Sequence, residues 1–168
     1  ESTTMTRLLD AGPPGFRAAL AAFCSTKPVM GTCAGLIMLS KDAGDERVKP
    51  FGVLPVTVER NAYGRQNESH VSLIDLDPVP DLDRPPSTQA DGPRKPYRAV
   101  FIRAPRISAC DPSVQVLARE PGGGSPVLVR WGNVLGLSFH PELNREDTRI
   151  HEYFLTAMKN VVSLHDVI

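Results

Sequence analysis

Gly31-Thr32-Cys33-Ala34-Gly35 is the stretch that decides the fold, because an apolar run precedes it and a helix-forming run follows it. Residues 27–31 predict a short buried strand, and residues 34–41 predict a helix. A nucleophile at the sharp turn between a strand and a helix is the arrangement called a nucleophile elbow, here with sulfur in place of a serine hydroxyl. Gly31 and Gly35 keep the neighbourhood of such a strained turn small. We therefore predict that Cys33 is a catalytic nucleophile.

The position of Cys33 also predicts its chemistry. A helix N-terminus favours the thiolate over the thiol, and the backbone N–H of Ala34 can face a developing oxyanion. The alternative is that Cys33 is a buried structural cysteine, which is common. Cys24 lies in an alanine-rich segment and Cys110 lies beside Asp111-Pro112, so both are interpreted as structural.

A candidate base for this nucleophile is His140, which follows the apolar run of residues 134–139. The active sites of open α/β sheets assemble at such strand ends. Glu142 lies two residues later, and in an extended segment residues i and i+2 point the same way. Its carboxylate can then orient the imidazole, and Pro141 restricts the backbone between them. A lone His-Pro-Glu is usually a turn, but together with the elbow it completes a nucleophile, base and orienter.

The rest of the chain alternates between helical and extended patterns, which indicates an α/β fold. We predict one domain over residues 1–168, with a proline-rich insertion loop at residues 78–96 that cannot form a regular element. Ser2 or Thr3 is the expected cap of the first helix. Phe16, Leu20 and Phe23 are expected on one face of the second. Helices are predicted at residues 2–9, 16–25 and 148–164, and further strands at 52–59, 71–76, 97–102, 114–119, 126–131 and 134–139.

Composition argues against several classes of protein. The chain has 168 residues with 19 basic and 19 acidic side chains, a balance that argues against nucleic-acid binding and against a polybasic membrane protein. Its longest nearly uncharged apolar run, residues 28–39, is too short to span a membrane. Three scattered cysteines imply no disulfide framework. No signal peptide is evident at the start, so we expect a cytoplasmic protein.

The combined motifs resemble those of class I glutamine amidotransferases, and within them the glutaminase subunits of pyridoxal 5′-phosphate synthase. The two triad motifs carry the wider resemblance, and four stretches carry the finer one. These stretches are Glu1-Ser2-Thr3-Thr4-Met5, Val58-Glu59-Arg60-Asn61-Ala62-Tyr63-Gly64-Arg65-Gln66, Val100-Phe101-Ile102-Arg103-Ala104-Pro105 and Ser138-Phe139-His140-Pro141-Glu142-Leu143.

The resemblance implies a fold, a reaction and a partner. The fold would be a three-layer, open, mostly parallel sheet with flanking helices, as in flavodoxin-like proteins. A Cys–His–Glu triad would hydrolyse L-glutamine to L-glutamate and ammonia without a metal or cofactor. The ammonia would pass to a synthase subunit with a (β/α)₈ barrel, which would also activate the glutaminase. The implied triad is Cys33, His140 and Glu142, and the implied glutamine contacts are Glu1, Ser2, Arg60, Ile102 and Arg103.

The start of the chain departs from the family pattern. In the family, Glu-Ser-Thr-Thr-Met follows Pro-Gly-Gly and a strand–helix–strand unit, whereas this sequence opens at Glu1. One of those glycines would supply an oxyanion-hole N–H, and loss of the first strands would expose apolar surface and an unpaired sheet edge. The alternative function is therefore a truncated, non-catalytic chain that at most binds the synthase. A cysteine hydrolase with another substrate is a third reading, disfavoured by the glutamine-contact segments.

Overall fold

The computed structural model describes residues 1–60, 69–76 and 95–163, without the side chains of 158–163. The proline-rich stretch at 78–96 therefore lies almost entirely outside the described residues, as do Asn61 to Gln66. The elements in chain order are α1 (Ser2–Asp10), α2 (Phe16–Thr26), β1 (Val29–Thr32), α3 (Ala34–Leu39), β2 (Ser40–Asp42), β3 (Leu54–Glu59), β4 (Ser69–Ile74), β5 (Tyr97–Ile102), β6 (Arg106–Cys110), β7 (Gln115–Arg119), β8 (Pro126–Trp131), β9 (Val134–Leu137), the 3₁₀ turn η1 (Pro141–Leu143) and α4 (Arg149–Ser163).

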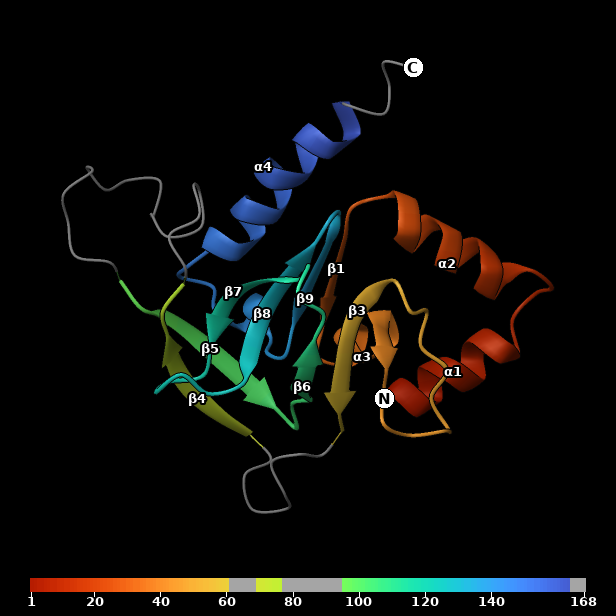
Figure 1. Cartoon of the computed structure of the whole chain (residues 1–168), viewed down its shortest axis with the longest axis horizontal. Coiled ribbons are helices and arrows are strands. Elements are labelled where there is room, and N and C mark those ends of the chain that lie inside the picture. Colours follow the sequence, from red (N-terminus) through yellow and green to blue (C-terminus); the bar gives the residue numbers. More distant parts are fainter. Residues whose placement is uncertain (61–68, 77–94, 164–168) are drawn as a thin grey trace.

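The described strands form three sheets with helices around them (Figure 1). One sheet has the order β1-β9-β8-β7, a second has the order β2-β3-β6, and β4 pairs with β5. The α/β class with flanking helices is confirmed. Among the described strands, however, only β1–β9 and β2–β3 are parallel, while the other four pairings are antiparallel. The sheets are therefore mixed rather than mostly parallel, because β7, β8 and β9 are joined by short connections that permit antiparallel pairing.

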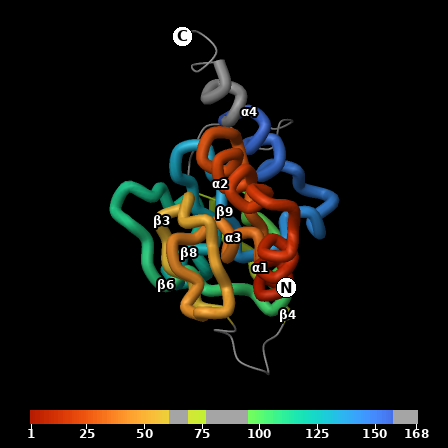
Figure 2. The backbone as a smooth tube through the Cα atoms, turned by 90° about the vertical axis from the view of Figure 1, so that its right-hand side faces the viewer, coloured from red at the N-terminus to blue at the C-terminus, as the bar shows by residue number. Residues whose placement is uncertain are grey.

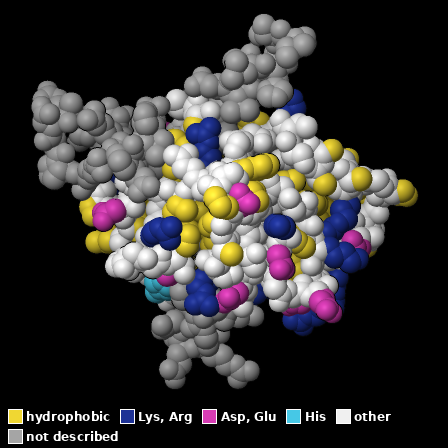
Figure 3. Space-filling view, viewed as in Figure 1, with side chains coloured by type: hydrophobic (Ala, Val, Ile, Leu, Met, Phe, Trp, Pro, Cys, Tyr) yellow, Lys and Arg dark blue, Asp and Glu magenta, His cyan; other side chains and the backbone are white. Residues whose placement is uncertain are grey.

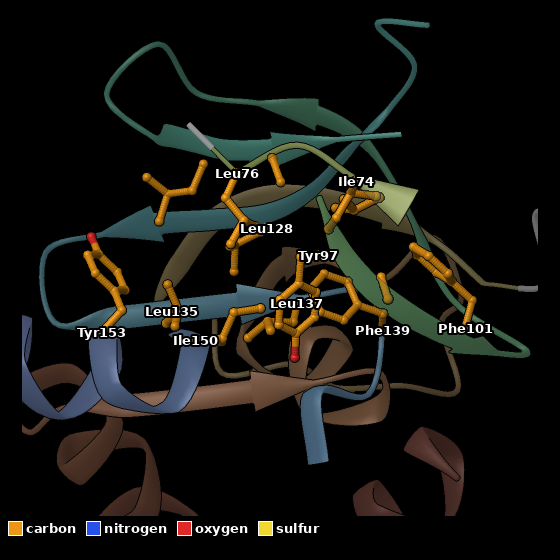
Figure 4. Close-up of a cluster of buried hydrophobic side chains, with 14 of the residues drawn as sticks. Ile74, Leu76, Tyr97, Phe101, Leu128, Leu135, Leu137, Phe139, Ile150 and Tyr153 are labelled. Carbon is orange, nitrogen blue, oxygen red and sulfur yellow. The ribbon is translucent and has the colours of Figure 1, made fainter. Parts of the chain in front are cut away.

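The central sheet separates two apolar clusters. Leu128, Leu135 and Leu137 face one side and pack with Ile150 and Tyr153 of α4, and Figure 4 shows these two side chains projecting from α4 toward Leu135. Val129 and Val134 belong to the cluster on the other side, which contains the four buried residues of α3. β8 and β9 thus supply residues to both faces, which gives the layered arrangement.

The N-terminal helices lie on the same side of the molecule as α3 (Figure 2). The first helix has Glu1 as its N-cap and no side-chain capping bond, so the expected cap at Ser2 or Thr3 is wrong. In α2 the buried residue is Cys24, with Leu20 partly buried, whereas Phe16 and Phe23 are 49% and 53% exposed. The apolar face expected for α2 is therefore only partly right.

The C-terminal end of α3 depends on tertiary pairing. The helix after the elbow ends at Leu39 because Ser40 begins β2, which pairs with β3. In the sheet β1-β9-β8-β7, β1 is an edge strand among the described residues and pairs with β9. No helix among the described residues is long and apolar enough to cross a membrane. Figure 3 shows acidic and basic side chains interspersed on the face turned to the viewer.

Candidate active site

Cys33 occupies the turn between β1 and α3 in a strained backbone conformation, with φ +49° and ψ −105°. Its N–H donates to the Leu137 carbonyl at 2.9 Å, which ties the turn to the end of β9. A Cβ on Gly31 would lie 2.8 Å from the Gly35 carbonyl carbon and 2.5 Å from Leu39 Cδ1. Gly31 is thus required by close approach of the helix. A Cβ on Gly35 would meet nothing within 4 Å, so no such contact explains that glycine.

The Cys33 thiol is buried, at 5% exposure, and donates to the Ile102 carbonyl over 3.7 Å. Burial raises its pKa, and the negative charge of Glu1 raises it further, outweighing the lowering by the Ala34 N–H and by Arg103. The N–H at the start of the helix therefore acts in the predicted direction, but burial outweighs it and the pKa of the thiol is raised. The six-residue helix α3 does not compensate for the loss of hydration.

Cys33 and Ala34 line a pocket of about 150 Å³ on the surface beside α1. Each residue that the family resemblance assigns to glutamine also lines it. Across the pocket, Arg103 Nη2 lies 3.5 Å from Glu1 Oε1, and both side chains are mostly exposed. The full lining is Glu1, Ser2, Cys33, Ala34, Ile37, Arg60, Ile102, Arg103 and Pro105. The pocket therefore combines a thiol with two guanidinium groups and a carboxylate.

Two of these lining residues carry unusual constraints. Arg103 has φ +43°, the left-handed region that non-glycine residues rarely adopt, and it directly follows the strand end at Ile102. Arg60 directly follows β3, and its guanidinium is ion-paired with Asp45. The sequence patterns gave no indication of Asp45, since it lies 15 residues from Arg60 and belongs to no motif. Ile37 and Pro105 were likewise not predicted as lining residues.

His140 and Glu142 form a direct contact, with Nδ1 2.7 Å from Oε1. The contact was expected from an extended segment, but Pro141–Leu143 is a 3₁₀ turn with His140 as its N-cap. A carboxylate only accepts hydrogen bonds, so Nδ1 carries the proton in this contact, and in a neutral imidazole Nε2 would keep its lone pair. The His140 side chain is 20% exposed and that of Glu142 is 52% exposed.

His140 and Glu142 are not among the residues that line the pocket, but the backbone ties His140 to the same strands as Cys33. The His140 N–H donates to the Val100 carbonyl at 2.9 Å. Val100 belongs to β5, whose last residue, Ile102, accepts from the Cys33 thiol. Leu137, three residues before His140, accepts from the Cys33 N–H. Two strand ends thus meet at the nucleophile and at the base.

No group of three or more His, Cys, Asp or Glu side chains within residues 1–60, 69–76 and 95–157 is placed to hold a metal ion. The described residues offer a thiol in the pocket and, tied to the same strands through its backbone, an imidazole that contacts a carboxylate. A pocket with charges of both signs suits a small zwitterion.

Comparison with known proteins agrees with this geometry. A profile of the SNO glutamine amidotransferase family matches residues 1–160. The chain belongs to this family. It is 44% identical over 160 residues to the pyridoxal 5′-phosphate synthase subunit PdxT of Koribacter versatilis, covering 95% of this chain and 73% of the relative. It is also 44% identical to PdxT of Methanothrix thermoacetophila, with 94% and 75% of the two chains covered.

A solved structure supports the same assignment. A glutamine amidotransferase crystal structure superposes with a TM-score of 0.73 at 39% sequence identity, covering 92% of this chain and 73% of that one. The resemblance to glutaminase subunits drawn from the motifs is confirmed, and so is the enzyme class, a glutamine amidotransferase. The roles of individual residues in this family member stay predictions.

Proposed function

We propose that this chain hydrolyses L-glutamine to L-glutamate and ammonia through Cys33, His140 and Glu142, and that it delivers the ammonia to a pyridoxal 5′-phosphate synthase subunit with a (β/α)₈ barrel. One observation carries the proposal. A single pocket collects Cys33 and Ala34 with all five residues expected to contact glutamine, namely Glu1, Ser2, Arg60, Ile102 and Arg103. A guanidinium suits the substrate carboxylate, and the Glu1 carboxylate suits its ammonium.

The proposed mechanism starts from the buried thiol and the His140–Glu142 contact. Burial raises the pKa of the Cys33 thiol, and in the proposed mechanism His140 Nε2 takes its proton as sulfur attacks the side-chain amide carbon. The Ala34 N–H stabilises the oxyanion. The imidazolium, held by Glu142, gives its proton to the departing ammonia, which leaves a γ-glutamyl thioester on Cys33. His140 then removes a proton from water, whose attack on the thioester releases glutamate and returns the thiol.

The experiment combines this chain with a pyridoxal 5′-phosphate synthase subunit and supplies glutamine labelled with ¹⁵N in its amide. Glutamate release is expected, and Cys33→Ala should lower its rate by about four orders of magnitude or more. The label is expected in the pyridoxal ring even with unlabelled ammonium in excess, because delivered ammonia does not mix with the medium.

Three outcomes of this experiment would contradict different parts of the proposal. Hydrolysis by Cys33→Ala at the original rate would contradict the triad. Hydrolysis with an unlabelled ring would contradict delivery to the synthase. A chain that binds the synthase but releases no glutamate would be the non-catalytic alternative.

A further inference from the structure

Asp45 forms an ion pair with Arg60, the pocket arginine that directly follows β3. Arg60 Nη1 bonds to Asp45 Oδ2, and the two side chains are only 18% and 17% exposed. Arg60 lines the pocket beside Cys33, whereas Asp45 lies behind it, outside the lining. Partial burial makes this charge-assisted bond stronger than a pair at the open surface.

The loop that carries Asp45 is held firmly against β3. Ala43 and Val48 are 2% and 5% exposed and anchor the loop in the apolar cluster beneath it. Gly44 has φ +61°, and a Cβ there would lie 3.3 Å from the Val58 carbonyl of β3. This close approach brings Asp45 to the end of β3, where Arg60 follows Glu59.

The Asp45 carboxylate is itself fixed. Oδ1 accepts from the Arg47 N–H at 2.9 Å and from Arg47 Nε at 3.0 Å, and Oδ2 accepts from Arg47 Nη2 at 2.8 Å. These bonds hold the pKa of Asp45 far below its usual range, so the group is charged at any working pH. A permanent negative charge of fixed position therefore stands beside the Arg60 guanidinium.

We propose that Asp45 is a positioning residue that holds the Arg60 guanidinium in the orientation that receives the glutamine carboxylate. The proposal rests on the function proposed above. Arginine has five N–H donors in a planar fork, and the bond to Asp45 occupies one nitrogen while leaving the rest of the fork available. Without Asp45, the long side chain keeps its rotamer freedom, and the substrate has to order it on binding. Asp45 therefore acts on glutamine affinity and leaves the chemical step unchanged.

Steady-state kinetics with the synthase subunit present tests this. Asp45→Asn should raise KM for glutamine about five- to thirtyfold, the effect of weakening one part-buried ionic hydrogen bond, with kcat unchanged. Asp45→Glu, which keeps the charge, should lie closer to the unsubstituted protein. Asp10→Asn is the matched control, because Asp10 also bridges two cations, Lys49 and Arg17, but does not line the pocket. Its KM should not change.

Calorimetric titration of glutamine into Cys33→Ala separates this inference from the function it rests on. Tight binding to Cys33→Ala that weakens by the same factor in Cys33→Ala/Asp45→Asn supports the positioning role. Equal binding by both, or an Asp45→Asn enzyme with unchanged KM, overturns it while the glutaminase proposal stands. An unsubstituted protein that neither binds nor hydrolyses glutamine overturns both.

Discussion

Cys33 combines a strained backbone with a buried sulfur whose pKa is raised. The left-handed φ turns the residue out of β1, and burial then disfavours the thiolate. In the proposed mechanism, a thiol with a raised pKa needs a base at the moment of attack, and the His140–Glu142 contact would orient that base. The proposed mechanism therefore deprotonates the nucleophile during its attack, as a serine hydrolase does, and does not begin from a thiolate that is already formed.

The pH dependence of alkylation tests this reading of Cys33. A raised pKa means that the thiolate forms only at higher pH than in a free cysteine, whose pKa is about 8.5. In a Cys24→Ala/Cys110→Ser background, which leaves Cys33 as the single cysteine, the iodoacetamide reaction rate should still be rising above about pH 9. A rate that reaches its plateau below about pH 8 would instead indicate an ion pair between the thiolate and His140.

At the scale of the element, the elbow depends on contact between the glycine before the nucleophile and the helix after it. Gly31→Ala would push a Cβ against the Gly35 backbone, which cannot move as a side chain can. We expect it to destabilise the fold by about 1–3 kcal/mol, as overpacking does, and to displace Cys33. Urea unfolding and glutaminase rate measure the two effects.

Gly35→Ala is the matched control for Gly31→Ala. Open space surrounds the added Cβ, and alanine favours helix, so its stability should equal or exceed that of the unsubstituted protein. Equal loss of stability in both variants would show that the close approach at Gly31 is not the cause.

Elements with strong local patterns were predictable from the sequence. The strand at Tyr97–Ile102 was predicted with its observed bounds, and the antiparallel pairing of β7 with β8 across Gly122-Gly123-Gly124 was expected. The strand β6 was missed because Ile107 is its only fully buried residue, so it has no alternating pattern. It exists through its pairing with β3, which no local rule reveals.

In the candidate site, too, local motifs were predictable from the sequence and features set by the tertiary structure were not. Cys33, His140 and Glu142 stood in recognisable motifs, but the 3₁₀ turn that joins the last two was not expected. The direction of the Cys33 pKa shift was also missed, because burial depends on the whole fold while the helix N-terminus is a local feature. Asp45 belongs to neither motif, and only tertiary structure brings it to Arg60.

At the scale of the molecule, the segment from His140 to Arg149 runs along β5 and joins the base to the core. His140 N–H bonds to Val100, and Asn144 Nδ2 donates to the Arg98 carbonyl at 3.0 Å. The Arg149 guanidinium lies 5.7 Å from the centre of the Tyr97 ring. Contacts along one strand thus hold both the turn that carries His140 and Glu142 and the start of α4.

The ion pair between Asp147 and Arg149 locks this segment, and its loss should be costly. Arg149 is 2% exposed, and its Nη2 lies 2.7 Å from Asp147 Oδ2. Burial would raise the pKa of Asp147, but the bonds and charge of Arg149 outweigh it and leave the pKa lowered. Asp147→Ala leaves the buried guanidinium without this carboxylate and should cost about 3 kcal/mol in urea unfolding at pH 7.

The lowered pKa also predicts the pH range of this contribution. A carboxyl with a depressed folded-state pKa stabilises the protein above its unfolded value of about 3.9, and the stabilisation is lost as pH falls through the folded value. The stability difference between the unsubstituted protein and Asp147→Ala should therefore be constant near neutrality and shrink below about pH 4. Asp10→Ala, which removes the exposed pair with Lys49, should cost much less because solvent screens that pair. Equal costs for the two variants, or a difference that persists undiminished into acid, would show that the Asp147 carboxylate does not lock the segment.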